Sequence, residues 1–270
     1  MATQPASYLL AGQASELKRL QLQSRVWEPA ARALLAELPN GADAAALEVG
    51  CGVMGWLRAL SNWVGARGNV VGTDVDEKML AGAQQFVQAE SLPNVKLLQD
   101  DLFQSRLPPK SFDLVHARFQ IAPLGRAAEQ LAAYLRLVRP GGLVILEDPD
   151  LASWRLNPDA PALHRLIELI DQGFRASGGD FNAGRSLPAL LRSFGMEPSV
   201  RAHVLALDPG HPYLRLPVQF ATALRPRLQL LLPLAELDQL AREAEAELAR
   251  PQIWGTTFTL IQAFATAPAS

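Results

Sequence analysis

A glycine-rich turn that could bind a nucleotide lies between the first expected strand and the helix that follows it. Glycine stands at positions 50, 52 and 55 of the run Leu47 to Gly55, which gives the spacing GxGxxG. Glycine lets the backbone turn sharply and approach a ligand, because no Cβ stands in the way. This spacing alone does not decide among the classes of ligand that such a turn can bind.

Three acidic residues at the ends of three consecutive expected strands narrow the ligand class. Glu48 lies two residues before Gly50, Asp74 ends the second strand and Asp101 follows the third. A carboxylate at the position of Asp74 can accept hydrogen bonds from ribose hydroxyls. Glu48 would repel a pyrophosphate at the helix N-terminus, whereas it suits a ligand that carries an ammonium group. The three carboxylates therefore favour a cationic adenosine derivative over a dinucleotide.

The glycine turn and the acidic residues lie among short apolar runs that alternate with helical patterns. The alternation is typical of βαβ units that build a parallel sheet. The expected strands are residues 45–49, 69–73, 94–98, 112–116 and 143–147. Upstream of them, residues 14–38 predict two helices separated at Glu28-Pro29, because proline suits the first turn of a new helix. Two later apolar segments, 200–207 and 256–265, indicate further strands.

Five ordered motifs make the sequence resemble the class I S-adenosylmethionine-dependent methyltransferases over roughly residues 40–150. The motifs are Glu48–Gly52, Val71–Asp76, Gln99–Leu102, Ser111–Arg118 and Leu137–Gly142. The resemblance is to small-molecule methyltransferases of the kind that act in ubiquinone and menaquinone biosynthesis. It implies an α/β fold with a doubly wound, Rossmann-like, seven-stranded sheet and helical cap insertions, in which the last two strands form an antiparallel pair.

The resemblance also implies a cofactor, S-adenosyl-L-methionine, with S-adenosyl-L-homocysteine as the product. The glycine loop would pass under the methionine moiety, and Glu48 would help to hold its amino group. Asp74 would bind the ribose, while Asp101 and Leu102 would read the edge of the adenine. The residues that match the cofactor-binding positions are Glu48, Gly50, Cys51, Gly52, Asp74, Val75, Asp101, Leu102, Ala117 and Arg118.

Two positions depart from the family pattern, and one further stretch resembles a lid. Many relatives have glycine where this chain has Met54, so we expect a slightly reshaped loop. Pro123-Leu124 stands where a subgroup has a His-Leu pair, so any role of that histidine is absent here. The N-terminal stretch with Gln23 and Trp27 is similar to the helical lid of small-molecule methyltransferases, whose residues close over the cofactor.

Several other side chains are open to both a functional and a structural interpretation. His116 could act as a general base, but it lies inside a predicted strand, and we favour a buried histidine that supports the site. No catalytic residue is predicted, because methyl transfer requires mainly close approach and alignment. Residues after the fifth strand or in the cap could contact the substrate. These candidates are Asp148, Trp154, His164 and Tyr213.

Composition excludes several classes of protein. The 270 residues are 49% hydrophobic and 19% charged, with a net charge of −2, which indicates a globular chain without a broad basic field for nucleic acid. The one cysteine, Cys51, has no partner for an internal disulfide and no histidine near it in sequence to activate it as a nucleophile. No leader, no membrane-inserting run and no metal-ligand spacing is recognised, so we expect a cytoplasmic protein without a metal. The sequence does not decide between a monomer and a homodimer.

The predicted organisation is a single methyltransferase domain, residues 1–270. Its predicted parts are an N-terminal helical lid (1–40), a cofactor-binding core (41–150), a helical cap (151–186 and 209–252) and the final strands (187–208 and 253–268). The predicted activity is methyl transfer to an oxygen, nitrogen or carbon of a small, largely apolar metabolite. Two alternatives stay open, a non-methylating enzyme or binding protein that uses the same cofactor, and an NAD-dependent oxidoreductase, which Glu48 and Asp101 disfavour.

Overall fold

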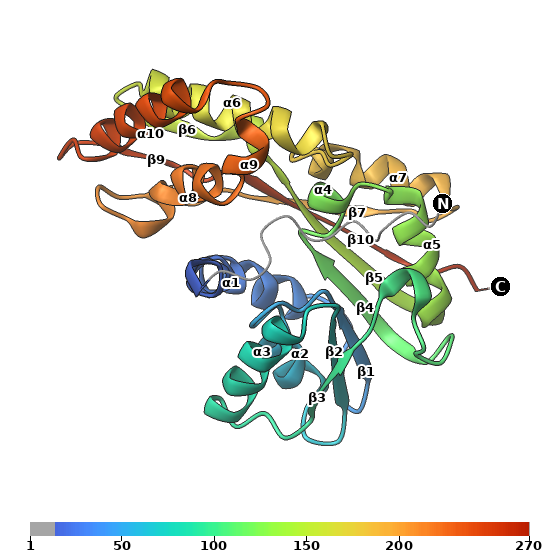
Figure 1. Cartoon of the computed structure of the whole chain (residues 1–270). Helices are drawn as coiled ribbons and strands as arrows, with labels where there is room; N and C mark the ends of the chain where they lie inside the picture. Colours follow the sequence, from blue (N-terminus) through green and yellow to red (C-terminus); the bar gives the residue numbers. More distant parts are fainter. Residues whose placement is uncertain (1–13, 270) are drawn as a thin grey trace.

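The computed structural model of the protein describes residues 14–269 and is built around a seven-stranded sheet (Figure 1). The central strands of this sheet are mostly buried and rich in the apolar and β-branched residues that favour a pleated, buried surface. The strands of this sheet are β1 (Ala45–Val49), β2 (Asn69–Asp74), β3 (Val95–Gln99), β4 (Phe112–Arg118), β5 (Val138–Asp150), β7 (Ser199–His203) and β10 (Thr259–Thr266). Their order across the sheet is β3-β2-β1-β4-β5-β10-β7.

The direction of the strands confirms the predicted fold class. Neighbouring strands from β3 to β5 run parallel, whereas β10 runs antiparallel to both β5 and β7. The chain therefore winds outward from β1 to β3, returns to β4 on the other side of β1, and ends in the antiparallel pair. In such a sheet, ligands bind at the carboxyl ends of the strands where the order reverses, here between β1 and β4.

Helices connect the parallel strands and cover both faces of the sheet. They are α2 (Leu57–Val64), α3 (Glu77–Ala89), α4 (Ile121–Leu124), α5 (Ala127–Leu137) and the short 3₁₀ helix η1 (Leu102–Gln104). Helix α3 begins as the sequence predicts, because Asp76 caps it by accepting a hydrogen bond from the backbone N–H of Lys78. The fully buried Leu57 and Leu60 of α2 lie in one core cluster with Ala46 of β1, whereas Leu47 of β1 belongs to a second core cluster.

The N-terminal segment is one helix, α1 (Ala14–Leu35), so the prediction of two helices separated at Glu28-Pro29 is wrong. Pro29 lies inside the helix, where it removes one backbone hydrogen bond. The helix continues because Trp27, Ala31 and Leu34 on one of its faces are completely buried. Their burial offsets the loss at Pro29. Residues 1–13 of the predicted lid lie outside the described residues.

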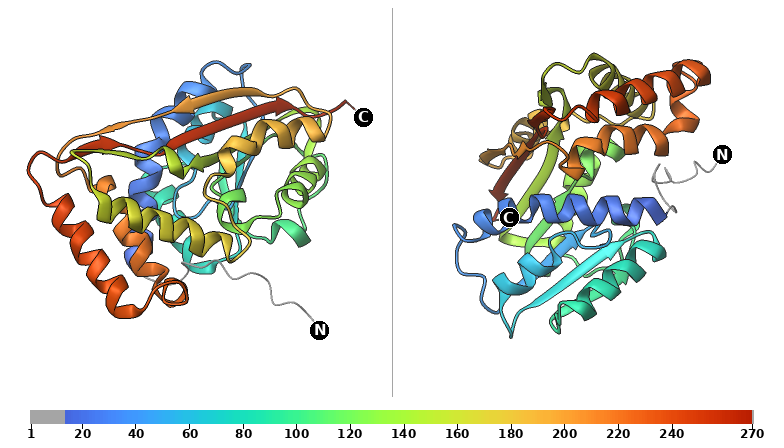
Figure 2. Two further views of the ribbon diagram at one scale, coloured as in Figure 1. Left: turned by 90° about the horizontal axis from the view of Figure 1, so that it is seen from above. Right: turned by 90° about the vertical axis from the view of Figure 1, so that its left-hand side faces the viewer.

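A cap of helices lies at one end of the sheet, beyond α1 (Figure 2). Helix α6 contacts α8 and α10, and a small three-stranded sheet of order β6-β9-β8 completes the cap. Its elements are η2 (Leu151–Ser153), β6 (Arg155–Asn157), α6 (Pro161–Arg175), β8 (Ala206–Leu207), η4 (Pro212–Arg215), α8 (Leu216–Ala223), α9 (Arg225–Leu228), α10 (Leu234–Leu248) and β9 (Trp254–Thr256). The 3₁₀ helix η3 (Ala183–Ser186) and helix α7 (Leu187–Ser193) lie instead against the large sheet, where η3 contacts β5 and α7 contacts β10 and α5. The domain boundaries within the chain remain a prediction. Among the helices described, none is long and apolar enough to cross a membrane.

Candidate functional site

The glycine loop leaves β1 at the position where the strand order reverses. Gly50, Gly52 and Gly55 have φ angles of 63°, 53° and 43°, in the left-handed region that glycine adopts with least strain. At Gly55 a second constraint applies, because a Cβ there would lie 2.4 Å from Oε1 of Glu48. The loop therefore needs glycine to bring its backbone to the carboxyl edge of the sheet.

Asp74 holds the glycine loop from the neighbouring strand. Its Oδ2 accepts a hydrogen bond from the backbone N–H of Gly52 at 3.0 Å, and its Oδ1 accepts one from Asp76 at 3.0 Å. Burial raises the pKa of Asp74, and these backbone donors oppose part of that rise. Each carboxylate oxygen retains acceptor capacity for a further donor, so Asp74 can serve the loop and a ligand together.

The next strand end contributes Asp101 and Leu102. Asp101 caps η1 by accepting a hydrogen bond from Phe103 N–H at 3.0 Å, and Leu102 is partly buried beside it. β2 and β3 run in register, so these residues lie at the same edge of the sheet as Asp74. Val75 is 53% exposed at that edge. The edge therefore offers two carboxylates and an unburied apolar side chain.

Glu48 points beneath the glycine loop. It is 1% exposed, and its Oε1 accepts a hydrogen bond from the backbone N–H of Trp56 at 3.0 Å. Its Oε2 lies 2.5 Å from Nδ1 of His116 on the adjacent strand. Glu48, which precedes the loop, thus binds the backbone of Trp56 after the loop and also contacts His116 of β4.

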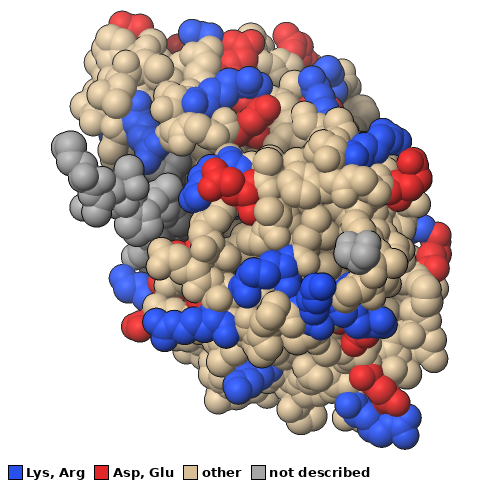
Figure 3. All heavy atoms as spheres, turned by 90° about the vertical axis from the view of Figure 1, so that its right-hand side faces the viewer, with Lys and Arg blue, Asp and Glu red and all other residues tan. Residues whose placement is uncertain are grey.

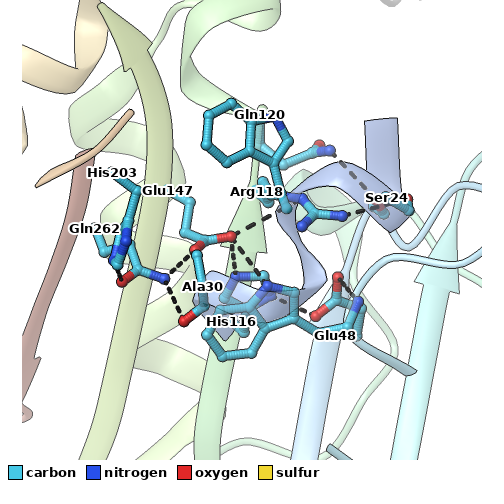
Figure 4. A network of polar contacts seen from close by, with 12 residues as sticks. Ser24, Ala30, Glu48, His116, Arg118, Gln120, Glu147, His203 and Gln262 are labelled. Carbon is cyan, nitrogen blue, oxygen red and sulfur yellow. Dashed lines mark hydrogen bonds and ion pairs between the residues drawn. The ribbon is translucent and has the colours of Figure 1, made fainter. Parts of the chain in front are cut away.

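His116 belongs to a buried polar network that crosses β1, β4, β5 and β10 (Figure 4). Its Nε2 lies 3.3 Å from Oε2 of Glu147, which also accepts a hydrogen bond from Trp56 Nε1 at 3.0 Å. Gln262 Nε2 donates to Oε1 of Glu147 at 2.5 Å. The Trp56 and His116 rings stack with centroids 3.8 Å apart. His116, Glu147 and Gln262 are completely buried, so this network is isolated from solvent.

Both nitrogens of His116 face carboxylates, which determines its protonation. Burial lowers the pKa of His116, but the charge of Glu48 and the hydrogen bonds with Glu147 and Glu48 raise it more, and the net pKa lies above the ordinary value. The same contacts, against the effect of burial, lower the pKa of Glu147. A doubly protonated ring donates to both carboxylates and has no free lone pair. The structure therefore places His116 as the buried, supporting histidine that we favoured.

Arg118 extends this network toward α1. It ends β4 after the buried Ala117, and its Nε lies 3.9 Å from Oε2 of Glu147. Its Nη2 donates to the hydroxyl of Ser24 in α1 at 3.2 Å. Beside it, Gln120 Nε2 donates to the carbonyl of Gly50 at 3.4 Å. At the end of β4, a cation and an amide therefore lie beside the glycine loop.

Helix α1 lies between the glycine loop and the cap. Leu20 Cδ1 is 3.9 Å from the position that a Cβ of Gly52 would occupy. Gln23 is buried and accepts a hydrogen bond from Arg19 Nη1 at 2.6 Å, and the Arg19 guanidinium lies 4.6 Å from the centre of the Phe220 ring in α8. Helix α1 therefore contacts both the glycine loop and the cap, and its role as a lid stays a prediction.

An aromatic cluster joins α1 to the cap. Trp27 Nε1 donates to the Tyr213 hydroxyl at 2.9 Å, and Trp154 stacks on Tyr213 with ring centroids 6.0 Å apart. The Phe258 ring lies within 6.3 Å of all three of these rings. The structure thus brings together two substrate candidates, Trp154 and Tyr213, with the lid candidate Trp27.

The other two substrate candidates lie elsewhere. Asp148 is 1% exposed and its Oδ1 accepts a hydrogen bond from the backbone N–H of Ala122 at 2.9 Å. Burial raises its pKa to about 8, although the backbone N–H groups of α4 oppose the rise. His164 lies in α6 with its Nδ1 3.2 Å from Asp159. Asp148 therefore accepts a hydrogen bond from the first turn of α4. His164 is paired with Asp159, five residues earlier in the sequence.

Sequence reasoning missed four residues that the structure places at the site. They are Ser24, Gln120, Phe258 and Gln262. Gln262 could have been recognised from the sequence, because it is a polar residue within the apolar run 260–265 of the final strand. Burial strongly raises the pKa of the Cys51 thiol, which agrees with a cysteine that is no nucleophile. Within residues 14–269, no three His, Cys, Asp or Glu side chains are grouped to hold a metal ion.

Comparison with known proteins identifies the domain that carries this site. A methyltransferase-domain family model matches residues 46–142. Demethylmenaquinone methyltransferases of Geobacillus stearothermophilus and Bacillus cereus (strain B4264) are each 37% identical to this chain over 100 residues. That stretch is 37% of this chain and 43% and 42% of those two relatives, so the match covers less than half of either.

Solved structures agree with the fold over nearly the whole chain. A SAM dependent methyltransferase from Aquifex aeolicus superposes with a TM-score of 0.57 at 17% identity, covering 95% of this chain and 99% of that one. A Haemonchus contortus phosphoethanolamine N-methyltransferase, solved with phosphomonomethylethanolamine and S-adenosylhomocysteine, superposes with a TM-score of 0.56 at 16% identity. It covers 99% of this chain and 61% of that one. Residues 46–142 of this chain therefore match a methyltransferase domain, and nearly the whole chain shares the fold of solved methyltransferases.

Proposed function

We propose that the protein binds S-adenosyl-L-methionine at the carboxyl edge of β1 to β4 and transfers its methyl group to a small, largely apolar metabolite. The observation that carries this proposal is the preformed glycine loop, held in a left-handed conformation by Asp74. Asp101 and Leu102 lie at the next strand end of the same edge. This combination suits a ligand with a ribose, an adenine and a cationic amino-acid part.

Each residue at this edge would contact a different part of the cofactor. The backbone of Gly50 to Gly52 would pass beneath the methionine moiety, and Asp74 would accept hydrogen bonds from the ribose hydroxyls. The exposed side chain of Val75 would pack on one face of the adenine, with Asp101 and Leu102 at its edge. Glu48, buried beneath the loop, would act through the loop on the methionine amino group.

The bound cofactor would supply an electrophilic methyl group on its sulfonium. The chain would contribute alignment and exclusion of water, which are the main requirements of an in-line displacement. Trp27, Trp154, Tyr213 and Phe258 form a buried aromatic cluster that joins α1 to the cap, and α1 also lies against the glycine loop through Leu20. His116 would not act as the general base, because both of its nitrogens are occupied by carboxylates.

The nature of the acceptor is also a proposal. Two relatives at 37% identity are demethylmenaquinone methyltransferases, which supports an apolar ring as the acceptor class here. The aromatic cluster, and the substrate candidates Trp154 and Tyr213 within it, suit such a ring. On the face shown in Figure 3, basic side chains lie among acidic ones, which suits a small-molecule partner better than a nucleic acid.

Two measurements test the proposed activity. Purified protein is titrated with S-adenosyl-L-homocysteine and separately with NADH, and the proposal expects binding of the first only. The protein is then incubated with methyl-labelled cofactor and a panel of quinols, phenols and apolar amines, and labelled product is expected from at least one class. Tight binding without product across the panel would favour the non-methylating alternative, and binding of NADH alone would favour the oxidoreductase.

A further inference from the structure

The last strand of the large sheet has an unpaired outer edge. β7 (Ser199–His203) pairs with β10 on one side only, and β8 (Ala206–Leu207), which follows it, is likewise the last strand of the small sheet. In Figure 2, β7 lies at the border of the large sheet, beside β10. In the part of the chain that the structure describes, no strand pairs with the outer edge of either one. Backbone N–H and C=O groups on such an edge are open to another strand.

β7 lacks the features that usually protect an edge strand. Natural edges are blocked by lysine, by proline, by a bulge or by an inward-pointing charge. The one Lys, Arg, Asp or Glu residue of β7, Arg201, pairs with Glu37 in the turn after α1. His203 Nε2 lies 2.8 Å from Gln262 Oε1, and Gln262 Nε2 donates to the carbonyl of Ala30 in α1 at 3.4 Å. The polar side chains of β7 are thus turned toward α1, and they leave the backbone edge unprotected.

The opposite face of the same segment carries an exposed apolar stripe. Because side chains alternate between the two faces of a strand, Val200, Ala202 and Val204 share the face opposite to Arg201 and His203. All three are exposed, Val200 to 48% and Val204 to 49%. An unpaired edge beside an exposed apolar stripe favours pairing with another strand.

The stripe is complementary to itself. A two-fold axis pairs a strand with its own copy in the antiparallel direction. With the axis at Ala202, Val200 lies opposite the partner's Val204 at both ends, and the two alanines meet at the centre. Apolar cross-strand pairs of this kind stabilise a sheet. With the axis at Arg201, two like charges would lie directly opposite each other, which disfavours that register.

The charges on the other face are compatible with the same pairing. With the axis at Ala202, Arg201 lies opposite the partner's His203, and Arg201 keeps Glu37 as its counterion. The pairing also brings the acidic Glu37 to the face that the partner's His203 occupies. The Arg201–Glu37 pairs of the two copies sum to zero charge, so they add no net repulsion.

We propose that the protein forms a two-fold symmetric homodimer in which β7 pairs antiparallel with β7 of a second copy, centred on Ala202. The two large sheets then become one continuous sheet. A lipid surface or a nucleic acid offers no ladder of N–H and C=O groups, so a strand is the partner that this edge fits. The inference does not depend on the proposed function, because β7 is the last strand of the sheet and the glycine loop follows the central β1.

The first test measures self-association of the full chain by sedimentation, at concentrations from about 1 to about 100 μM, where small interfaces assemble. The wild type should pass from monomer to dimer. Val200→Lys/Val204→Lys sets like charges opposite each other and should raise the dissociation constant at least about tenfold. Val200→Lys/Val204→Glu sets opposite charges there and should retain the dimer. The control is Leu230→Lys, since Leu230 is 81% exposed in the cap, and it should change nothing.

A disulfide between two copies tests the pairing without added charge. Ala202→Cys introduces an exposed thiol, while the native Cys51 is buried. Opposite residues of antiparallel strands have Cα atoms about 4.5–5.5 Å apart, within the range that a disulfide spans. We expect Ala202→Cys to form a cross-linked dimer under mild oxidation. Ala249→Cys, exposed at the end of α10, should not.

Several results would overturn the inference. A monomer over the whole concentration range would leave the edge to a strand of another protein. A dimer that Val200→Lys/Val204→Lys leaves intact would mean that the copies meet elsewhere. Loss of the dimer in both double variants, or a dimer that Ala202→Cys does not cross-link, would exclude the pairing centred on Ala202. Melting temperatures show whether the charged variants fold, and if they do not, the cross-linking result decides alone.

Discussion

The His116→Gln variant tests the buried network most severely. In the protein, His116 joins the carboxylates of Glu48 and Glu147, and all three side chains are at most 1% exposed. Removal of the imidazole leaves Glu147 with donors from Trp56 and Gln262, but it leaves Glu48 with only the backbone N–H of Trp56. Breaking a buried ion pair from one side costs about 3–5 kcal/mol. We expect a loss of stability in that range.

The assay is urea denaturation followed by tryptophan fluorescence, since Trp56 stacks on His116. His164→Gln serves as the control, because His164 also contacts a carboxylate, Asp159, but is partly exposed, and its loss is expected to be below about 1 kcal/mol. A loss below about 1 kcal/mol for His116→Gln would refute the reasoning, because it would mean that the two carboxylates do not depend on the histidine.

The same histidine predicts a pH dependence. The folded pKa of His116 lies above its ordinary value of 6.5, so the stabilisation is fully present below pH 6.5 and is lost as the pH rises through the folded pKa. Denaturation midpoints of the wild type should therefore fall on the alkaline side of pH 6.5. In His116→Gln the denaturation midpoint should fall less over the same pH range. An identical dependence of the midpoint on pH in both proteins would contradict the raised pKa of His116.

Three further predictions follow from single contacts. Asp74→Ala should weaken S-adenosyl-L-homocysteine binding by about 1–3 kcal/mol in calorimetry, because ribose hydroxyls lose their acceptor, and unchanged affinity would count against the site. Burial raises the pKa of Asp148 to about 8, so its contribution to the free energy of unfolding is lost as the pH rises from about 4 through that value. Asp148→Asn should remove this part of the pH dependence, which urea titrations between pH 4 and pH 8 would measure. Gly55→Ala should lower stability by about 1–3 kcal/mol, because its φ is 43° and a Cβ would meet Glu48, and an unchanged melting temperature would disprove that constraint.

The sheet and the residues that meet at its carboxyl edge could be predicted from sequence because their signals are local. The glycine loop, Asp74 and Asp101 each lie at the end of a short, mainly apolar strand, and strand ends of a parallel sheet meet at one edge. Helix α1 shows the limit of local signals. Pro29 marks a helix start in isolation, whereas in the structure the helix continues and buries Trp27, Ala31 and Leu34 against the rest of the fold.

The buried network could not be predicted because its members are distant in sequence. Glu48, His116, Glu147 and Gln262 lie on four strands, and their contacts depend on register between strands rather than on any motif. The unpaired edge of β7 likewise depends on the order of the strands across the sheet, which no motif gives. The cap was predicted as helical, but the small sheet of β6, β9 and β8 has strands of two or three residues, too short to give a periodic signal.

The most direct test of the proposed function is a calorimetric titration of the full chain with S-adenosyl-L-homocysteine, with Asp74→Ala measured in parallel. We predict one site per chain in the wild type, and a clearly weaker site in a variant that remains folded. Absence of binding to the wild-type protein, or binding that Asp74→Ala leaves unchanged, would contradict the assignment of this edge of the sheet as the cofactor site.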